Sequence, residues 1–322
     1  MEIRLLDSRG MEDYFRLAEE HGSVFNTRAW LEIYDQRNLK VFGIFDKGGL
    51  LTGGFQIYQA RRAALSFYRN PPFSPHIGLF YENRSVNPAK AQSAEKNMLT
   101  AVAAFLKRLP WQVLSVALPV GFIDAQPFTW DKFKVVPGYT YRLDLTVPVE
   151  ETYREMMPER RNDISKAVKD GIEVTEVSDM AVVEALVQNT FERQSKSLDK
   201  LHLGRVLRNF PGQGNSFAMV AFQDGKPLAT CFCIFDGKTV YYLLGGYDSQ
   251  NRHKGAGALA IWKSVEKAES INRLVFDFEG SMVPWIERYF RGFGGRLTPY
   301  LTINRASMPL EIFLKFIKRD IF

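Results

Sequence analysis

Three short apolar runs joined by two Asp-Gly turns constrain the fold more than any other feature of the sequence. The runs cover residues 217–222, 228–235 and 239–244, and the turns are Asp224-Gly225 and Asp236-Gly237. Asp-Gly between apolar runs is a strong hairpin signal, because a tight hairpin turn needs positive φ angles that glycine adopts at little cost. The sequence therefore predicts an antiparallel meander in the second half of the chain.

The first half of the chain predicts a similar order of elements. Helical spacing of apolar residues predicts helices at 11–20, 28–36 and 88–107. Extended runs bounded by turn signals predict strands at 40–45, 50–58, 63–68, 111–117 and 139–146. In the second half, the same signals predict helices at 159–170, from Ser178-Asp179 onward, at 256–268, 284–291 and 310–318, with further strands at 172–177, 273–278 and 297–303. Gly171 fits a left-handed helix cap.

This repeated order predicts an α+β fold with two tandem domains, each a mostly antiparallel sheet flanked by helices. The chain has 322 residues, enough for roughly two domains of ~150 residues each. We expect a first domain over residues 1–148, a second over 149–305, and a C-terminal helix within 306–322 that packs back on the first domain.

Composition excludes several classes of protein. A hydrophobic share of 46% and a charged share of 24% exclude a disordered chain, a collagen and a coiled coil. The net charge of +6 permits a phosphate-rich partner without requiring one. The two cysteines, Cys231 and Cys233, exclude a disulfide framework, and the four histidines lack metal-ligand spacing, so we expect no metal. Neither a signal peptide nor a spanning segment is apparent, so we expect a cytoplasmic protein.

The segment from Gly245 to Ala258 carries the strongest functional signal. A strand ends, a loop with Arg252 and Lys254 follows, and the Gly-Ala-Gly of residues 255–257 opens a helix. The first turn of a helix has free N–H groups and the positive end of the helix dipole, so it attracts anions. Glycine lets a diphosphate approach the backbone closely. The alternative is a flexible loop with a solvated basic edge.

Candidate catalytic groups lie on both sides of this loop. Backbone N–H groups at Leu244, Gly245 and Gly246 could stabilise an oxyanion. Asp277 and Glu279 alternate at a strand end and share a face, so either could take a proton, unless both only cap the turn that follows. Tyr289 is a candidate acid for the leaving group, with core packing as the alternative. A nucleophile elbow is absent, which favours direct attack without a covalent enzyme intermediate.

Two further groups of polar residues are candidates for binding a substrate. On the helix at 159–170, the polar side that includes Arg161, Asn162 and Lys166 could meet an anionic acceptor, or could be a solvated face. Arg193 and Gln194 follow the next helix and could line the same groove.

Three stretches resemble a known family. Residues 252–257, Arg-His-Lys-Gly-Ala-Gly, resemble the Arg/Gln-x-x-Gly-x-Gly/Ala loop that binds the pyrophosphate of acyl-CoA in the GNAT N-acyltransferase superfamily. Residues 160–171 resemble the Arg-Asn-x-Ile-x-Lys-Ala…Gly helix of Fem-type peptidoglycan aminoacyltransferases and their acyl-CoA-using relatives. Residues 276–295 resemble the signature that follows the last core strands of that group.

The resemblance implies two GNAT-like domains with one donor site, in the second half, where the backbone of Gly255, Ala256 and Gly257 would hold a pyrophosphate. In the first half, the equivalent loop contains Pro71, Pro72 and Pro75, which lack backbone donors. We therefore expect the first domain to be degenerate and to shape the acceptor groove.

The function implied is N-acyl transfer to an amine acceptor, a small molecule or a peptide such as a cell-wall precursor. The loop favours acyl-CoA as the donor. Aminoacyl-tRNA is the alternative donor, although the sequence shows no dense basic run beyond Arg160-Arg161. A non-catalytic binding module on the same fold is the alternative function. Oligomeric state is not predicted.

Overall fold

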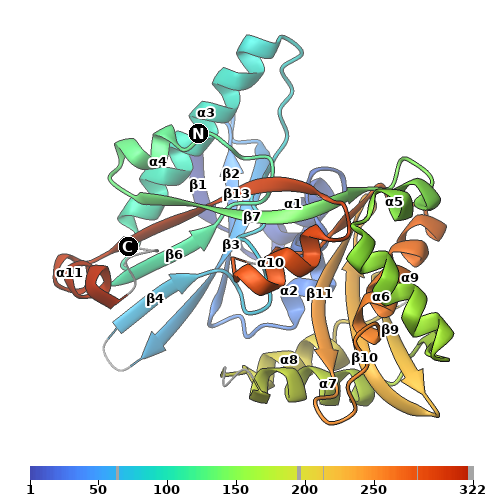
Figure 1. Ribbon diagram of the computed structural model, residues 1–322. Helices are drawn as coiled ribbons and strands as arrows, with labels where there is room; N and C mark the ends of the chain where they lie inside the picture. Colours follow the sequence, from blue (N-terminus) through green and yellow to red (C-terminus); the bar gives the residue numbers. More distant parts are fainter. Residues whose placement is uncertain (63–64, 194–196, 213, 281, 318–322) are drawn as a thin grey trace. The chain divides into compact units, whose positions relative to one another are not determined.

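The computed structural model of the protein describes residues 1–62, 65–193, 197–212, 214–280 and 282–317 (Figure 1). The chain divides into two compact units. Unit 1 contains Met1–Gly138 and Pro299–Phe322, and unit 2 contains Tyr139–Thr298. Each unit has a sheet with helices, and the predicted α+β fold is confirmed.

Unit 1 is built on a sheet with the strand order β1-β2-β3-β4-β6-β13. Its strands are β1 (Glu2–Leu5), β2 (Leu39–Phe45), β3 (Leu51–Arg62), β4 (Leu65–Arg69), β5 (Phe80–Tyr81), β6 (Val113–Ala117) and the later part of β13 (Arg296–Ala306). Its helices are α1 (Ser8–His21), η1 (Val24–Asn26), α2 (Arg28–Glu32), α3 (Pro88–Arg108), α4 (Gln126–Trp130) and α11 (Met308–Ile317). Met98, Val102 and Leu106 follow one side of α3 at helical spacing and are buried in the core of this unit.

Unit 2 has the strand order β7-β12-β11-β10-β9-β8. Its strands are β7 (Lys134–Asp144, from Tyr139 onward), β8 (Glu173–Glu176), β9 (Ser216–Gln223), β10 (Lys226–Phe235), β11 (Thr239–Tyr247) and β12 (Val275–Asp277). Its helices are α5 (Val149–Glu155), α6 (Pro158–Lys169), α7 (Met180–Arg193), α8 (Lys200–Arg208), α9 (Ala256–Ser270) and α10 (Pro284–Arg291). Strands β9, β10 and β11 form the predicted antiparallel meander.

The two predicted hairpin turns form in different ways. Asp224 and Gly225 both adopt positive φ, 49° and 74°, as the Asp-Gly signal predicts. At the second turn, the Asp236 side chain accepts the backbone N–H groups of Lys238 and Thr239, each at 2.9 Å. The second turn is therefore held by an aspartate side chain, and glycine at position 237 is not required by a positive φ. Gly171, with φ of 75°, caps α6 as predicted.

The last predicted strand of each half belongs to the sheet of the other unit, which corrects the sequence-based prediction. Residues 142–144 of β7 pair with β12 in unit 2, and residues 302–306 of β13 pair with β6 in unit 1. The compact units consequently divide after Gly138 and Thr298, and not at the predicted limits of 148 and 305. Alternating apolar residues identify a strand but do not identify its partner, because any free sheet edge can accept it.

Helices α7 and α9 pack on opposite faces of the unit 2 sheet. A side chain on Gly246 would point at the backbone of Leu186 and Val187 in α7. Successive strand residues face opposite sides, so Gly245 faces away from α7, together with its cross-strand partner Cys231. Cys231 and Cys233 are buried in the core that α9 covers, and both are free thiols, as predicted. Within the described ranges, no helix is long and apolar enough to cross a membrane.

Candidate active site

Strand β11 loses its strand neighbour halfway along its length. It pairs with β12 in parallel only from Thr239 to Tyr241, and then continues to Tyr247. The register with β10 shifts between Tyr242 and Leu244, which makes Leu243 a β-bulge. A bulge turns backbone groups away from the regular ladder. The predicted oxyanion donors at Leu244, Gly245 and Gly246 therefore lie just after a bulge, on a strand edge that β12 leaves uncovered.

The first turn of α9 supplies unpaired backbone donors. The N–H of Gly255 donates to His253 Nδ1 at 3.1 Å, and the N–H of Ala256 donates to the His253 carbonyl oxygen at 3.2 Å. The helix has no side-chain cap, and no described protein group accepts the N–H groups of Gly257 and Ala258. Ala258 is fully buried and Gly257 is half-buried, so the N–H group of Gly257 is the one of these two that an anion can approach.

The two glycines of the loop have different surroundings, and each is glycine for a different structural reason. A Cβ atom on Gly255 would lie 2.0 Å from the backbone oxygen of Asp163, so glycine at this position lets α6 pack closely against α9. A Cβ atom on Gly257 would meet only the Tyr289 hydroxyl oxygen, at 3.4 Å. The expectation that both glycines open the backbone to a ligand does not fit Gly255, which is buried against α6, and for Gly257 it stays a prediction.

The basic residues of the loop are exposed and partly paired. Arg252 donates from Nε to the backbone oxygen of Ser249 at 3.0 Å. Lys254 Nζ lies 3.3 Å from Asp163 Oδ1, and its side chain is 70% exposed. His253 is fixed between the Gly255 N–H and the carboxylate of Asp170, 2.9 Å from Nε2. The loop therefore has a fixed backbone around His253 and two cations at its surface.

Two tyrosine hydroxyls lie near the donors of α9 and β11. Tyr289, on α10, stands beside Gly257, and the guanidinium of Arg160 lies 4.4 Å from the centre of its ring. Tyr242, on β11, has its hydroxyl where a side chain at Gly245 would stand. Burial raises the pKa of both hydroxyls above the ordinary tyrosine value, so both stay protonated at neutral pH and can donate a proton.

Tyr242 and Arg160 are the residues that sequence reasoning missed as parts of the site. Tyr242 reads as one apolar member of a strand. From sequence, Arg160 and Arg161 look like two exposed basic residues. The side chain of Arg160 is buried, however, and forms an ion pair with Asp163 at 2.8 Å. The only early signal was the match of residues 160–171 to a Fem-type helix, which marked the segment without assigning Arg160 a contact.

Asp277 and Glu279 have different surroundings. Asp277 is buried, accepts a hydrogen bond from the Thr140 hydroxyl at 2.6 Å and one from the Glu279 N–H at 2.9 Å, and pairs with Arg142 Nε at 3.2 Å. Glu279 adopts φ of 56°, and its carboxylate has no hydrogen-bond or ion-pair partner among the described residues. Asp277 is therefore a fixed anchor, and Glu279 is the carboxylate that remains available.

The surroundings of Asp277 and Glu279 raise the pKa of both carboxyl groups. Burial raises the pKa of Glu279 well above its ordinary value, the charge of Asp277 raises it further, and Arg142 opposes the shift. Burial also raises the pKa of Asp277, against the hydrogen bond from Thr140 and the charge of Arg142. Both carboxylates act on the pKa of Tyr241, on the α7 face of the sheet, whereas α9 and α10 cover the other face.

The predicted substrate-binding residues are not brought together. Asn162 and Lys166 are exposed on α6, and Arg161 donates to the backbone oxygen of Arg154. Arg193 ends α7, with its guanidinium 4.6 Å from the centre of the Tyr247 ring. Since α6 packs on α9 and α7 lies on the opposite face of the sheet, these residues do not line one groove. Gln194 lies outside the described residues.

Sequence comparison identifies the family of unit 2. Residues 159–291 match the acetyltransferase (GNAT) domain. Residues 159–291 therefore form a GNAT acetyltransferase domain. The match begins in α6 and ends with α10, so it contains the α9 turn, the bulge of β11 and both carboxylates. None of the curated proteins matches the chain in sequence. Within the described ranges, no cluster of side chains suited to a metal ion is found.

Solved structures share the fold over the whole chain. FemX is 12% identical with a TM-score of 0.67, and the match covers 98% of this chain and 100% of that one. L-PGS from Bacillus licheniformis is 11% identical with a TM-score of 0.56, covering 99% and 98%. A tandem GNAT protein from the clavulanic acid biosynthesis pathway is 13% identical with a TM-score of 0.52, covering 94% and 98%. The Fem-like tandem GNAT fold is thus confirmed.

Proposed function

We propose that this GNAT protein transfers an acyl or aminoacyl group from an activated donor to an amine. The observation that carries the proposal is the unpartnered N–H group of Gly257 in the first turn of α9, where a Cβ atom would meet only the Tyr289 hydroxyl. A helix start of this kind binds phosphate groups through its amides and dipole. The start of α9 lies in the same unit as the uncovered edge of β11, which offers further backbone donors. Anion binding and carbonyl chemistry can therefore occur in the same unit.

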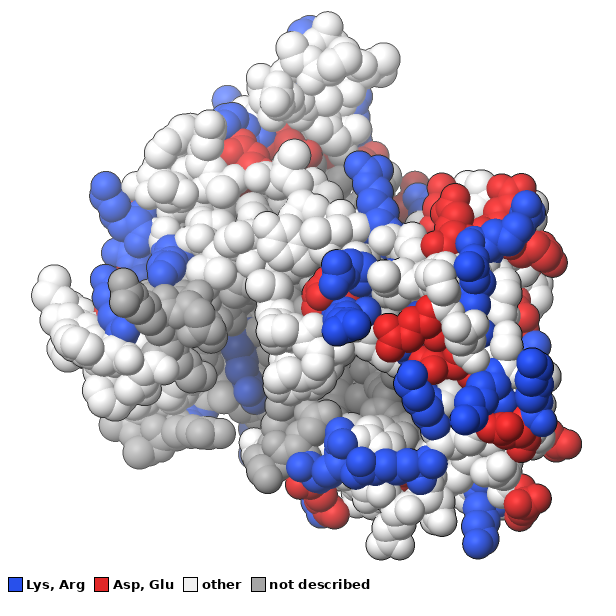
Figure 2. All heavy atoms as spheres, in the orientation of Figure 1, with Lys and Arg blue, Asp and Glu red and all other residues white. Residues whose placement is uncertain are grey.

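Acyl-CoA is the donor that these residues fit best. The amide of Gly257 and the positive end of the α9 dipole would hold its diphosphate, with Arg252 and Lys254 at the surface of the loop. The donor supplies a thioester, whose carbonyl is already activated toward an amine. Aminoacyl-tRNA would need a broad basic surface. Figure 2 shows positive and negative side chains interspersed where α6 and α10 lie, which favours the smaller donor. We place the reaction in the cytoplasm.

The proposed mechanism uses groups from both faces of the sheet. The amine nitrogen attacks the carbonyl carbon, and Glu279 accepts the proton that the amine loses. Those of the N–H groups of Leu244, Gly245 and Gly246 that point away from β10, toward the uncovered edge, donate to the oxygen on which charge develops. The Tyr289 hydroxyl, beside Gly257, donates a proton to the leaving group. Because β12 leaves the edge of β11 uncovered beyond Tyr241, acceptor and donor can meet from opposite faces.

Unit 1 is proposed to have lost donor binding and to serve acceptor recognition. The Asn70 side chain holds its proline loop: it donates to the Pro75 carbonyl oxygen at 2.8 Å and accepts the Ala117 N–H at 2.9 Å. Pro71 and Pro72 have no N–H. For the acceptor we propose the amine of a small molecule or peptide. The resemblance of residues 160–171 to Fem-type peptidoglycan aminoacyltransferases favours a cell-wall peptide precursor.

The test is amine-dependent release of CoA thiol from acetyl-CoA, with the acylated product identified by mass spectrometry across a panel of amines and peptides. We expect release with the parent protein and its loss in Glu279→Gln and Gly257→Val, while the exposed control Asn162→Gln keeps the parent rate. Transfer from charged tRNA alone would assign the other donor. Acetyl-CoA binding without turnover on any amine would indicate a binding module instead, and failure to bind either donor would contradict the proposal.

A further inference from the structure

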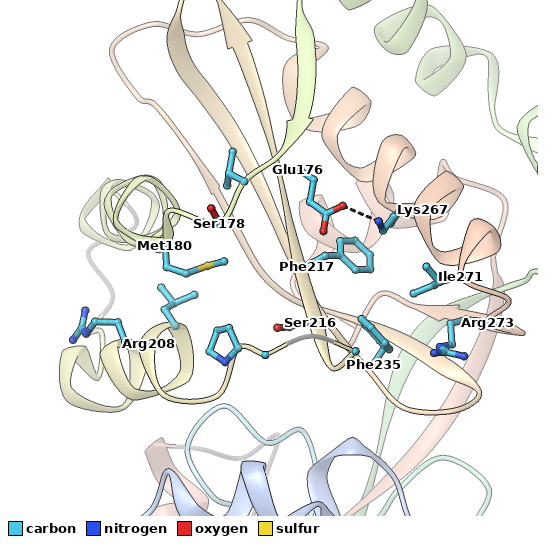
Figure 3. Close-up of a pocket in the computed structure, with 15 residues that line it drawn as sticks. Glu176, Ser178, Met180, Arg208, Ser216, Phe217, Phe235, Lys267, Ile271 and Arg273 are labelled. Carbon is cyan, nitrogen blue, oxygen red and sulfur yellow. Dashed lines mark ion pairs between the residues drawn. The ribbon is translucent and has the colours of Figure 1, made fainter.

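A cavity lies in unit 2, away from the candidate active site (Figure 3). Its volume is about 790 Å³, within the usual range for small-molecule sites. It is lined by the start of α7, the end of α8, the start of β9 and the C-terminal end of α9. Ile271, at that end, is separated from Gly257 by about 21 Å of helix, at 1.5 Å per residue. The cavity is therefore not the donor site.

The inner wall of the cavity is apolar. The rings of Phe217 and Phe235 lie side by side, with centroids 6.0 Å apart, and both residues are almost fully buried. Met180 from α7 and Ile271 from α9 add aliphatic surface on either side, as Figure 3 shows. Met180 and Ile271 are half-buried and leave aliphatic surface for a hydrocarbon chain, because each methylene removed from water strengthens binding.

Three cations line the cavity, and two of them already have carboxylate partners. Lys267 Nζ lies 2.8 Å from Glu176 Oε2, the ion pair drawn in Figure 3. Arg208 forms an ion pair with Glu184. Among the described residues, no carboxylate lies within ion-pair distance of Arg273. The lining therefore keeps one positive charge that a monoanionic ligand would neutralise.

Arg273 is also held in place with an unused donor. Its guanidinium lies 5.1 Å from the centre of the Phe235 ring, and Nη1 makes a long contact of 3.5 Å to the Gly237 carbonyl oxygen. Its Nε is buried and has no hydrogen-bond partner. A buried donor without an acceptor is unfavourable. A carboxylate in the plane of the guanidinium would accept charge-assisted hydrogen bonds from its terminal nitrogens.

We propose that this cavity binds a medium-chain carboxylate, with its head group at Arg273 and its hydrocarbon chain between Met180 and Ile271. The site is separate from acyl transfer and does not depend on the proposed function. The ligand class follows from one unpaired cation at the edge of an apolar wall. A neutral chain would leave Arg273 unsatisfied, and a short carboxylate would leave the wall exposed to water.

The test is isothermal titration with hexanoate, octanoate and octanol, using the whole chain. We expect octanoate to bind roughly sixteenfold more tightly than hexanoate, from about fourfold for each of two added methylenes, and octanol to bind at least tenfold more weakly than octanoate. Arg273→Gln should weaken octanoate binding at least tenfold, while Arg16→Gln, which removes an exposed arginine elsewhere, should stay within twofold. Met180→Phe, which narrows the cavity from α7, provides a second variant that should weaken binding.

Hydrogen exchange locates the ligand. Octanoate should protect amides in residues 207–217 and 267–275, and Gly257→Val should leave octanoate affinity within twofold, because the donor site is not involved. Equal affinity for hexanoate and octanoate, equal binding by parent protein and Arg273→Gln, or protection confined to the α9 N-terminus would each overturn the proposal. Absence of octanoate binding would overturn it too, whatever the outcome of the transferase assay.

Discussion

At the scale of single residues, Gly255 and Gly257 stand two positions apart and have opposite reasons to be glycine. Gly255 has an ordinary φ of −93°, but a Cβ atom there would collide with the backbone of Asp163. Gly257 has only the Tyr289 hydroxyl near it. We predict that Gly255→Ala lowers stability by about 1–3 kcal/mol through overpacking. Gly257→Ala should raise it by about 0.5–1 kcal/mol through helix propensity. Thermal unfolding of both variants measures the contrast, and equal shifts would refute it.

Glu279 gives a prediction that combines activity and stability. Its raised pKa means that transfer should fall as pH drops through that raised value, because the base must be deprotonated. Glu279→Gln should lower kcat by roughly 10²–10⁴ and abolish this dependence, with the KM for the donor little changed. A pH–rate profile measures both effects, and a parent-like profile for Glu279→Gln would assign the base elsewhere.

The same shift has a stability consequence of defined sign. A carboxyl whose pKa is higher in the folded than in the unfolded state stabilises the fold below the unfolded pKa, and that contribution is lost as pH rises toward the folded pKa. Glu279→Gln should therefore flatten the decline of Tm above the ordinary glutamate pKa. Asp277→Asn serves as the contrast, because it removes the partner of Arg142 and Thr140 and should lower Tm.

At the scale of elements, the contact between α7 and β11 depends on Gly246. A Cβ atom there would lie 2.5 Å from the backbone of Leu186 and of Val187. We predict that Gly246→Ala pushes α7 off the strand and costs about 1–3 kcal/mol. Gly237→Ala is the matched control, since nothing lies within 4 Å of a Cβ atom there, and it should change stability by less than about 0.5 kcal/mol. Denaturant unfolding measures the free energy of unfolding of both variants. An equal loss for Gly246→Ala and Gly237→Ala would contradict the account.

Elements with local signals were predictable from sequence. The Asp224-Gly225 turn, the Gly171 cap and the helix at residues 284–291 needed only neighbouring residues, and all three form as expected. The short helices α5 and α8 and the edge strand β1 were missed. Edge strand β1 has a mostly exposed pattern, and short helices owe their stability more to tertiary packing than to their own sequence.

Candidate site residues were predictable only where a motif marked them. The loop at 252–257 pointed to the start of α9, but which amides are free depends on His253 and on the packing of α6. Likewise, Asp277 and Glu279 looked equivalent in sequence, and contacts with Thr140 and Arg142 distinguish them. Those contacts join residues more than a hundred positions apart, which no spacing argument reaches.

At the scale of the whole molecule, the exchange of β7 and β13 means that a cut at the apparent domain limit removes part of a core. Tyr141, Leu143 and Leu145 come before residue 149, yet they are buried in the core of unit 2. We predict that a fragment of residues 139–298 unfolds cooperatively, whereas a fragment of 149–305 has lost these side chains and the partner of β12 and does not. Circular dichroism melting of both fragments checks this, and a cooperative transition for 149–305 would refute it.

The central claim is that the free amide of Gly257, at the start of α9, holds the diphosphate of the donor. Its most direct test is thermal unfolding of the whole chain with CoA and with pantetheine, which lacks the diphosphate. At about 100 times its Kd, CoA should add about 2.7 kcal/mol, a shift of a few degrees, and pantetheine should add little. Gly257→Val should abolish the CoA shift, while Gly237→Ala keeps it. An equal shift with pantetheine, or a CoA shift that survives Gly257→Val, would contradict the account.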